Sequence, residues 1–194
     1  METVLETEAL LLRPWRLDDV EQLVEGLNNL AVAQWLAFVP HPYLRSDGLK
    51  WLEHCGRLSL DAGAPRDYEF AIERKADRAM IGGVSLNNID MARGRAGGGI
   101  WISAAYHRQG YGREAFGERI RFAFDTLNLL ELHNGYFAGN EPSWDLQKRF
   151  GYKRTAVEPR RRQCLADGSW KDEILTSLHK NDWIRAKGGV QRAS

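Results

Sequence analysis

Apolar residues recur with two different periods along the chain, and these periods predict its secondary structure. A recurrence every three to four residues predicts helices over 18–27, 46–58 and 111–127. Strict alternation of polar and apolar positions predicts strands over 68–74 and 80–86, which would pair across a short polar turn. This part of the chain therefore combines helices with an antiparallel hairpin.

Further strands are expected at apolar runs bounded by proline, glycine or polar turns. These runs are Glu8–Trp15, Ile100–Ser103, Leu130–Phe137 and the two arms of a closing hairpin, Tyr152–Cys164 and Trp170–His179. Because a helix separates Ile100–Ser103 from Leu130–Phe137, we expect these two strands to run parallel and side by side. The order predicts an α+β fold, with a mixed, mostly antiparallel central sheet, one parallel strand pair and flanking helices.

The composition is that of a globular protein of 194 residues, with 43% hydrophobic and 10% aromatic residues. We expect one domain over 1–184 and a disordered tail over 185–194. The formal net charge of +1 gives no reason to expect nucleic acid or a membrane as a partner. The two cysteines, Cys55 and Cys164, lack metal-ligand spacing, so we expect small core residues in a reduced, cytoplasmic protein without a bound metal.

A polar elbow between the strand Ile100–Ser103 and the following helix carries the strongest chemical signal. Gly110 and Gly112 let the backbone approach a ligand closely. The first N–H groups of a helix lack intrahelical partners, and the helix dipole makes them electropositive. Arg108 and Arg113 add full positive charges. The elbow therefore predicts an anion site, most naturally for a phosphate or a pyrophosphate.

Two phosphate-binding designs fit this glycine pair, and a plain helix-capping turn is the remaining alternative. The first design is the dinucleotide pattern G-x-G-x-x-A, which the stretch 110–115 matches. That pattern requires a strand running directly into the first glycine and an acidic residue at the end of the next strand. Here six residues separate Ser103 from Gly110, and Glu131 would begin the next strand. The dinucleotide design is therefore the weaker match.

The second design is an acyl-CoA pyrophosphate arm of the form [Q/R]-x-x-G-x-[G/A]. The stretch 107–112 matches it, except that His107 stands where the motif prefers Gln or Arg. With this motif the chain resembles the GNAT N-acetyltransferase superfamily, and specifically its ribosomal-protein (Rim-type) branch. Further matches follow in order between Thr7 and Trp183: the opening strand, N-x-x-S at 140–143, K-x-x-G-Y at 148–152 (with Lys148 for the usual Glu), D-G-x-W-x-D at 167–172 and the terminal D-W at 182–183.

The resemblance implies an enzyme that transfers the acetyl group of acetyl-CoA directly to a primary amine, without a metal or a covalent enzyme intermediate. It implies that backbone N–H groups of the elbow hold the pyrophosphate. The pantetheine arm would pair with the strand at 100–103 in a splayed gap, where an N–H near Ile102 would stabilise the oxyanion. The cofactor-binding residues implied are Ile102, Ser103, Arg108, Gln109, Gly110, Tyr111, Gly112, Arg113, Asn140 and Ser143.

The catalytic residues are less clearly marked. Many GNAT enzymes protonate the leaving thiolate with a tyrosine, and Gln147 occupies that position here. Ser143 resembles the hydroxyl that Rim-type enzymes place near the sulfur, so it is the candidate acid or sulfur hydrogen-bond donor. His133 would lie beside the cofactor gap and titrates in the useful range, which makes it the candidate base. The other acceptor-side candidates are Glu69, Glu73, Asn87 and Asn88.

The acceptor is the least determined part of the function. An aromatic wall of Trp35, Phe38, His41 and Tyr43 is expected beside it. Acetylation of a protein N-terminal α-amine is the best-known activity of the Rim-type branch and is the favoured function. A small-molecule amine as acceptor, a catalytically idle acyl-CoA-binding module and a homodimer all stay open.

Overall fold

The computed structural model describes residues 3–60 and 67–190, and their strands form one sheet. The strands are β1 (Leu5–Glu6), β2 (Leu10–Pro14), β3 (Tyr68–Arg74), β4 (Met80–Asp90), β5 (Arg95–Gly97), β6 (Ile100–Ile102), β7 (Glu131–Phe137), β8 (Lys153–Arg154), β9 (Arg160–Gln163) and β10 (Trp170–His179). The α-helices are α1 (Val20–Leu27), α2 (Leu30–Ala33), α3 (Arg45–Leu60), α4 (Tyr111–Arg121), α5 (Glu141–Arg149) and α6 (Lys180–Val190). Short turns of other helix types are η1 (Leu17–Asp19), η2 (Ala104–Tyr106) and η3 (Phe122–Thr126).

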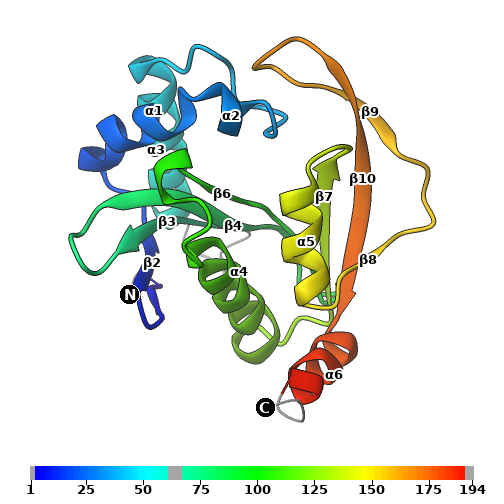
Figure 1. Ribbon diagram of the computed structural model, residues 1–194. Coiled ribbons are helices and arrows are strands. Elements are labelled where there is room, and N and C mark those ends of the chain that lie inside the picture. Colours follow the sequence, from blue (N-terminus) through cyan, green and yellow to red (C-terminus); the bar gives the residue numbers. More distant parts are fainter. Residues whose placement is uncertain (1–2, 61–66, 191–194) are drawn as a thin grey trace.

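The sheet is mixed, and its order is β1-β2-β3-β4-β5-β7-β10-β8, with β6 on β4 and β9 on β10. Every pairing is antiparallel except that of β5 with β7, which joins Arg95 to Glu131 and Ala96 to Leu132. The expected α+β fold with one parallel pair is therefore confirmed. β6 and β7 diverge beyond this pair in Figure 1.

The expected first member of the parallel pair was wrong. The segment Ile100–Ser103 was predicted to pair with β7, but β6 pairs antiparallel with β4, and β5 takes the place beside β7. The glycines between β5 and β6 explain why β5, and not β6, pairs with β7. Gly98 has φ +134°, and a Cβ there would lie 2.1 Å from the Ser85 carbonyl oxygen. Only glycine fits this close crossing, so the strand bends there, and β6 stays paired with β4 but no longer pairs with β7.

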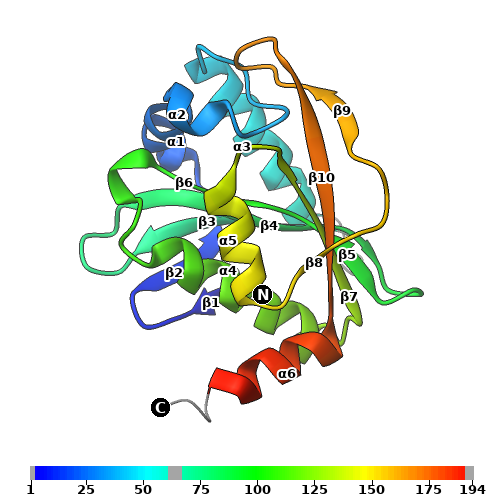
Figure 2. The same cartoon turned by 45° about the vertical axis from the view of Figure 1, so that its right-hand side comes forward.

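The helices divide between the two faces of the sheet. Alternate residues of β3 point to opposite faces. Phe70 and Ile72 join a core cluster with Phe116 of α4, whereas Ala71 joins a cluster with Leu23 of α1. Helices α1, α2 and α3 group together, apart from α4 and α5, in both views (Figures 1 and 2). Below, the two sides are called the α1–α3 face and the α4 face.

The chain ends differ from the sequence expectation. Helix α6 continues β10 and runs over Lys180–Val190, at the end of the sheet remote from α1 to α3 (Figure 2). The predicted disordered tail therefore does not begin at residue 185, and residues 191–194 lie outside the described part of the chain. Trp183 explains the helix, because it is 4% exposed and packs 5.4 Å from the Phe124 ring.

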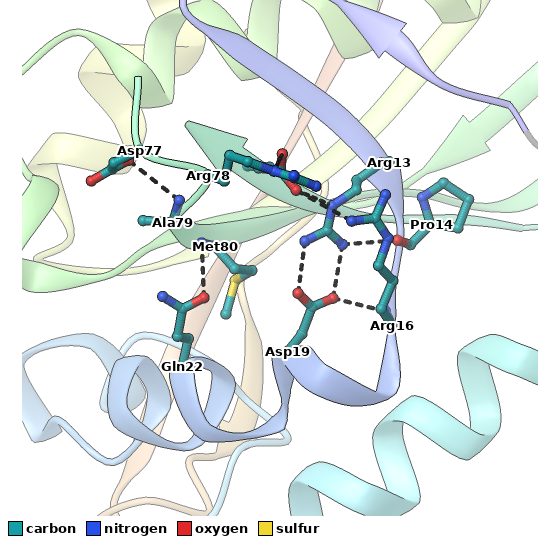
Figure 3. A network of polar contacts seen from close by, with 10 residues as sticks. Arg13, Pro14, Arg16, Asp19, Gln22, Asp77, Arg78, Ala79 and Met80 are labelled. Carbon is teal, nitrogen blue, oxygen red and sulfur yellow. Dashed lines mark hydrogen bonds and ion pairs between the residues drawn. The ribbon is translucent and has the colours of Figure 1, made fainter. Parts of the chain in front are cut away.

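A buried ion network joins the first strand to the first helices. The Arg13 guanidinium donates to Asp19 at 2.7 and 2.8 Å and to Glu73 at 2.5 Å, and each of these residues is 4% exposed. Figure 3 shows Arg13 and Asp19 facing each other, with Asp19 also accepting from the Arg16 N–H. Burial alone lowers the pKa of Arg13, but hydrogen bonds to the two carboxylates outweigh it and raise that pKa. Glu73, one of the candidate acceptor-side residues, is therefore a structural residue.

The first prediction concerns this network. Replacing Arg13 by methionine leaves the buried Asp19 carboxylate without its cation and leaves Glu73 with only the longer contacts to Arg16 and Arg78, each at 3.6 Å. We therefore expect the free energy of unfolding to fall by about 3–5 kcal/mol. Arg45→Met is the matched control, because Arg45 pairs with Glu21 at 2.8 Å while both side chains are more than half exposed. It should cost under about 1 kcal/mol. Urea unfolding of both variants measures the difference, and equal losses would contradict the assigned role of Arg13.

Candidate active site

The N-terminus of α4 presents unpaired backbone donors, as the sequence predicted. Gly110 precedes the helix with φ +90°, and the first intrahelical bond runs from the Glu114 N–H to the Gly110 oxygen at 3.0 Å. The N–H groups of Tyr111, Gly112 and Arg113 come before that bond and lack intrahelical acceptors. A Cβ on Gly110 would meet no atom within 4 Å, so the backbone there is open to a ligand.

The side chains of this loop differ in whether they are exposed or bonded to the rest of the chain. Arg108 and Arg113 are exposed, and the structure gives neither a carboxylate partner among the described residues. Gln109 donates back to the Ala105 oxygen at 2.9 Å, and the Tyr111 hydroxyl lies 3.5 Å from the Arg74 guanidinium. Two exposed cations thus flank the free N–H groups, whereas Gln109 and Tyr111 shape the loop. His107, the departure from the motif, places its Nε2 2.8 Å from the Ile102 oxygen.

The backbone of β6 offers one edge to β4, and its other edge has no strand partner in the described sheet. The Ser103 N–H donates to the Ile81 oxygen at 2.8 Å, and the Ser85 N–H donates to the Gly99 oxygen at 2.9 Å. Because backbone groups alternate in direction along a strand, the Ile102 N–H points away from β4. Ser103 differs from Ile102, since its carbonyl oxygen also accepts from the Tyr106 N–H and its hydroxyl faces Gly26 of α1.

Helix α5 begins with a side-chain cap, Asn140. The Asn140 side chain accepts from the Ser143 N–H at 3.3 Å. The Ser143 Oγ in turn accepts from the Gln147 amide at 3.2 Å, and the Gln147 carbonyl oxygen accepts from the Thr176 hydroxyl at 2.5 Å. Gln147 is 2% exposed and Thr176 is 1% exposed. Because the Ser143 oxygen already accepts a bond, its own O–H is left to donate outward.

Gln147 is thus a positioning residue that the sequence interpretation missed. It was noted only as the absence of a tyrosine. The signal for its role was its place four residues after Ser143, where two side chains on one helix face meet.

His133 lies on the opposite face of β7 from Ser143. Tyr136 stacks on Trp144 of α5 at 5.7 Å, so even-numbered positions of β7 face α5, whereas Phe137 packs with Ala33 of α2. His133 shares the face of Phe137. Its Nε2 lies 3.3 Å from the Glu131 carboxylate, and its side chain is 44% exposed. Ser143 and His133, the two predicted catalytic residues, therefore lie on opposite faces of β7 and do not contact each other.

Arg119 holds the point at which β5 and β7 separate, and sequence reasoning did not find it. Its side chain is wholly buried and donates to the Gly97 carbonyl at 2.7 Å and to the Asn134 side chain at 3.2 Å. No carboxylate pairs with it among the described residues, and its guanidinium lies 5.2 Å from the Phe116 ring centroid. Its spacing of three residues from Phe116, on the apolar stripe of the helix, was the available signal.

The predicted aromatic wall is not one surface. Tyr43 is a core residue at 6% exposure, Phe38 is 75% exposed beneath Arg162, and Trp35 packs beside Phe137. A different aromatic cluster lies on the α1–α3 face and is formed by Trp15, Trp51 and Trp101.

Several other expectations concern residues outside the site. Both cysteines are buried, as expected of core residues. Among residues 3–60 and 67–190, no cluster of three or more His, Cys, Asp or Glu side chains has a metal-binding arrangement. Within the same ranges, no helix is both long and apolar enough to span a membrane.

Comparison with known proteins fits this site. Residues 9–153 match the acetyltransferase (GNAT) domain, so the chain belongs to the GNAT acetyltransferase family and is an acetyl-CoA-dependent N-acetyltransferase. It is 26% identical over 192 residues to the protein named "Putative ribosomal N-acetyltransferase YdaF" of Bacillus subtilis (strain 168), covering 94% of this chain and 98% of that protein.

Solved structures share the fold. RimJ of Mycobacterium smegmatis, solved in complex with CoA-disulfide, superposes with a TM-score of 0.76 at 20% identity, covering 93% of this chain and 88% of that one. Spermidine N-acetyltransferase of Vibrio cholerae, solved with CoA and spermine, gives 0.75 at 18% identity, covering 92% and 99%.

The residues present fit acetyl-CoA better than a dinucleotide. The turn η2 separates β6 from Gly110, so no strand runs directly into the glycine pair as a dinucleotide fold requires. Free N–H groups, an open glycine and two exposed arginines suit a pyrophosphate. When bound, acetyl-CoA would supply the activated acetyl group.

The second prediction tests this anion loop. Gly110→Ala puts a side chain at φ +90°, which costs about 1–2 kcal/mol of backbone strain and shifts the N–H groups. We expect CoA to bind at least about tenfold more weakly, a loss of about 1.4 kcal/mol. Gly168→Ala is the control, because Gly168 also has positive φ (+69°) and open space but lies in the β9–β10 turn. Calorimetric titration with CoA should show a loss only for Gly110→Ala; equal affinities would contradict the assignment.

Proposed function

We propose that this enzyme transfers the acetyl group of acetyl-CoA directly to the N-terminal α-amine of a protein. One structural observation carries the proposal. Because β5 and β7 are parallel, the helices that follow their strands begin at the same edge of the sheet. The start of α4, with its unpaired N–H groups, and the Ser143 hydroxyl at the start of α5 therefore lie at the same edge of the sheet, where β6 and β7 diverge (Figure 1).

Each predicted cofactor residue has a place in this proposal. The N–H groups of Tyr111 to Arg113 hold the pyrophosphate, with Arg108 and Arg113 adding charge. The Ile102 N–H pairs with the pantetheine arm, which requires the His107 ring to leave the neighbouring Ile102 oxygen. Gln109 and Gly110 shape the loop, Ser103 lines the α1 side, and Asn140 fixes Ser143.

The reaction forms one C–N bond and breaks one C–S bond. A neutral amine attacks the thioester carbon, its surplus proton passes to a base, and the departing thiolate takes a proton. An α-amine has a pKa of about 8, against about 10.4 for a lysine side chain, so an α-amine needs less help from the protein. Ser143, oriented by Gln147, donates to the sulfur, and His133 is the base named from the sequence.

The choice of acceptor is supported by similarity to YdaF over nearly the whole of both chains. A small-molecule amine is the second candidate, because the spermidine enzyme of Vibrio cholerae has the same fold. An idle acyl-CoA-binding module is the third. The proposed partners are acetyl-CoA and an amine acceptor in a reduced, cytoplasmic setting.

One two-stage experiment separates these functions. Thermal unfolding with CoA, acetyl-CoA and NAD(H) measures which ligand stabilises the native state. Free-thiol release is then followed with N-terminal peptides and with polyamines. Stabilisation by acetyl-CoA and thiol release with peptides support the proposal. Release with polyamines alone would move the function to small molecules, and binding without any release would favour the idle module.

The third prediction concerns the Ser143–Gln147 pair. Ser143→Ala should lower kcat about 100-fold, in the range of a lost proton donor, with little change in acetyl-CoA affinity. Gln147→Leu removes the bond that orients Ser143 together with the acceptor of the buried Thr176 hydroxyl, so it should lower kcat less than Ser143→Ala does and should also lower the free energy of unfolding. The double variant should be no worse than Ser143→Ala, because both changes act through one hydroxyl. Gln163→Leu, at an exposed position, is the control. Additive losses would contradict this coupling.

A further inference from the structure

The anion loop, residues 107–110, is short and its backbone is strained. It joins Tyr106, which ends η2, to Tyr111, which begins α4. Arg108 and Gly110 within it both have positive φ, +60° and +90°. A left-handed arginine is unfavourable by itself, and such a conformation persists only where the surrounding structure holds it. The contacts made at the two ends of the loop therefore matter for its shape.

Arg74, the last residue of β3, contacts both ends of this loop. Its guanidinium carbon lies 4.9 Å from the centroid of the Tyr106 ring and 5.9 Å from that of the Tyr111 ring. The Tyr111 hydroxyl is 3.5 Å from the same guanidinium, and the two rings meet edge to face at 6.5 Å. A cation within about 6 Å of a ring centroid is attracted to the face of the ring. One side chain of the sheet thus joins the residue before the loop to the residue after it.

The Arg74 side chain is itself held in place. Asp77, in the turn between β3 and β4, accepts hydrogen bonds from the Arg74 Nε at 3.0 Å and from its Nη2. A guanidinium is planar, so its edge can pair with a carboxylate while its face covers an aromatic ring. A lysine ammonium has neither the plane nor the fork of donors. The contacts of Arg74 therefore require an arginine, and not merely a positive charge.

The first turn of α4 is held by the residue that follows Arg74. Glu114 accepts from the Thr7 hydroxyl at 2.5 Å and from the Ala9 N–H at 2.7 Å. The Lys75 N–H donates to the Ala9 oxygen at 2.9 Å, and its ammonium donates to the Thr7 oxygen at 2.5 Å. Consecutive residues at the end of β3 thus hold the loop directly and the helix through the β1–β2 turn.

We propose that Arg74 is a positioning residue for acetyl-CoA, which holds Tyr106 and Tyr111 so that the N–H groups at the start of α4 are already oriented for the pyrophosphate. This inference rests on the proposed function, which assigns the pyrophosphate to those N–H groups. The Tyr111 N–H is one of them, so the ring that Arg74 contacts and a donor for the ligand belong to one residue. Binding is tighter when donors are ordered beforehand. Because Asp77 and the two rings occupy the guanidinium, Arg74 acts through the loop.

The test measures the CoA affinity and the steady-state kinetics of Arg74→Met. Methionine removes the guanidinium, so the Kd for CoA and the KM for acetyl-CoA should rise about tenfold. The kcat at saturating acetyl-CoA should stay within about twofold of the wild-type value, because a loss of binding shared by ground state and transition state changes KM alone. Thermal unfolding without ligand reports that each variant is folded.

Arg93→Met is the matched control. Arg93 also pairs with an aspartate three residues away, Asp90 at 2.9 Å, in the turn after β4, and its side chain is 75% exposed. The substitution removes the same charge and the same kind of ion pair, but none of the contacts with the loop. It should change the Kd for CoA by less than about twofold.

Two measurements separate positioning from a direct attraction between Arg74 and the phosphates. Arg74→Lys keeps the charge, so a direct attraction predicts wild-type affinity, whereas positioning predicts a loss of at least about threefold. A direct attraction would also be screened at about 0.5 M salt, where the difference between Arg74→Met and the wild type would vanish. Positioning predicts that the difference remains.

Tyr106→Leu tests the same contacts without changing any charge. It should weaken CoA binding about as much as Arg74→Met, and the double variant should bind little more weakly than either, because both changes act on one contact. Equal affinities of Arg74→Met and the wild type, full recovery in Arg74→Lys, or additive losses in the double variant would overturn the inference alone. A wild-type protein that binds no CoA would refute the proposed function, and the inference would fall with it.

Discussion

The arrangement of this site depends on a single buried guanidinium. Arg119 reaches from α4 into the sheet and donates to the Gly97 carbonyl and to Asn134, which belong to the two strands that part there. A wholly buried charge is costly unless its donors are bonded. The structure adds the Tyr152 hydroxyl at 3.5 Å and the Phe116 ring to these acceptors, whereas the buried Arg119 Nε has no partner among the described residues. Because Arg119 ties Gly97, the residue directly after the last β5–β7 pair, to Asn134 of β7, it bridges the two strands where the divergence begins.

The two glycines that follow Gly97 direct the chain from the Arg119 contact onto β4. Gly98 passes so close to the Ser85 carbonyl that no side chain fits, and Ser85 then holds Gly99 through both its N–H and its hydroxyl. β6 is thereby committed to β4, and its outer edge is left without a strand partner in the described sheet. The free edge that suits an extended ligand is thus a consequence of two tight backbone contacts, rather than of β6 itself.

Local patterns in the sequence were sufficient for most of the helices and strands, although not for β5 or α6, and for the glycine turn that precedes α4. That turn depends on neighbouring residues alone, since positive φ at Gly110 and a following helix create it wherever the chain lies. The partner of β7 could not be predicted in the same way. Arg95–Gly97 carries no apolar alternation, and it becomes a strand only because Ala96 packs into the core beside Leu132.

The burial of certain polar residues could not be predicted from the sequence, for a related reason. Composition and periodicity assign glutamate, arginine and glutamine to the surface, as is usual for these types. Glu73 pairs with Arg13, Arg119 with a carbonyl, and Gln147 with a serine, and each partner is distant in sequence or one helical turn away. Burial of such groups is decided by tertiary contacts, so it cannot be inferred from a short stretch of sequence.

The two faces of the sheet divide the proposed chemistry between them. Ser143 lies at the start of α5, on the face of β7 that carries Tyr136, whereas His133, the base named from the sequence, lies on the face that packs with α2. In direct transfer the amine adds to one face of the planar thioester carbonyl, and the thiolate leaves the tetrahedral centre that forms. Nitrogen and sulfur therefore need different proton partners, an acceptor for the proton on nitrogen and a donor for the sulfur. In the proposed reaction, residues on opposite faces of β7 serve these two atoms without contacting each other, and the divergence of β6 and β7 beside Arg119 gives the bound acyl group access from both faces.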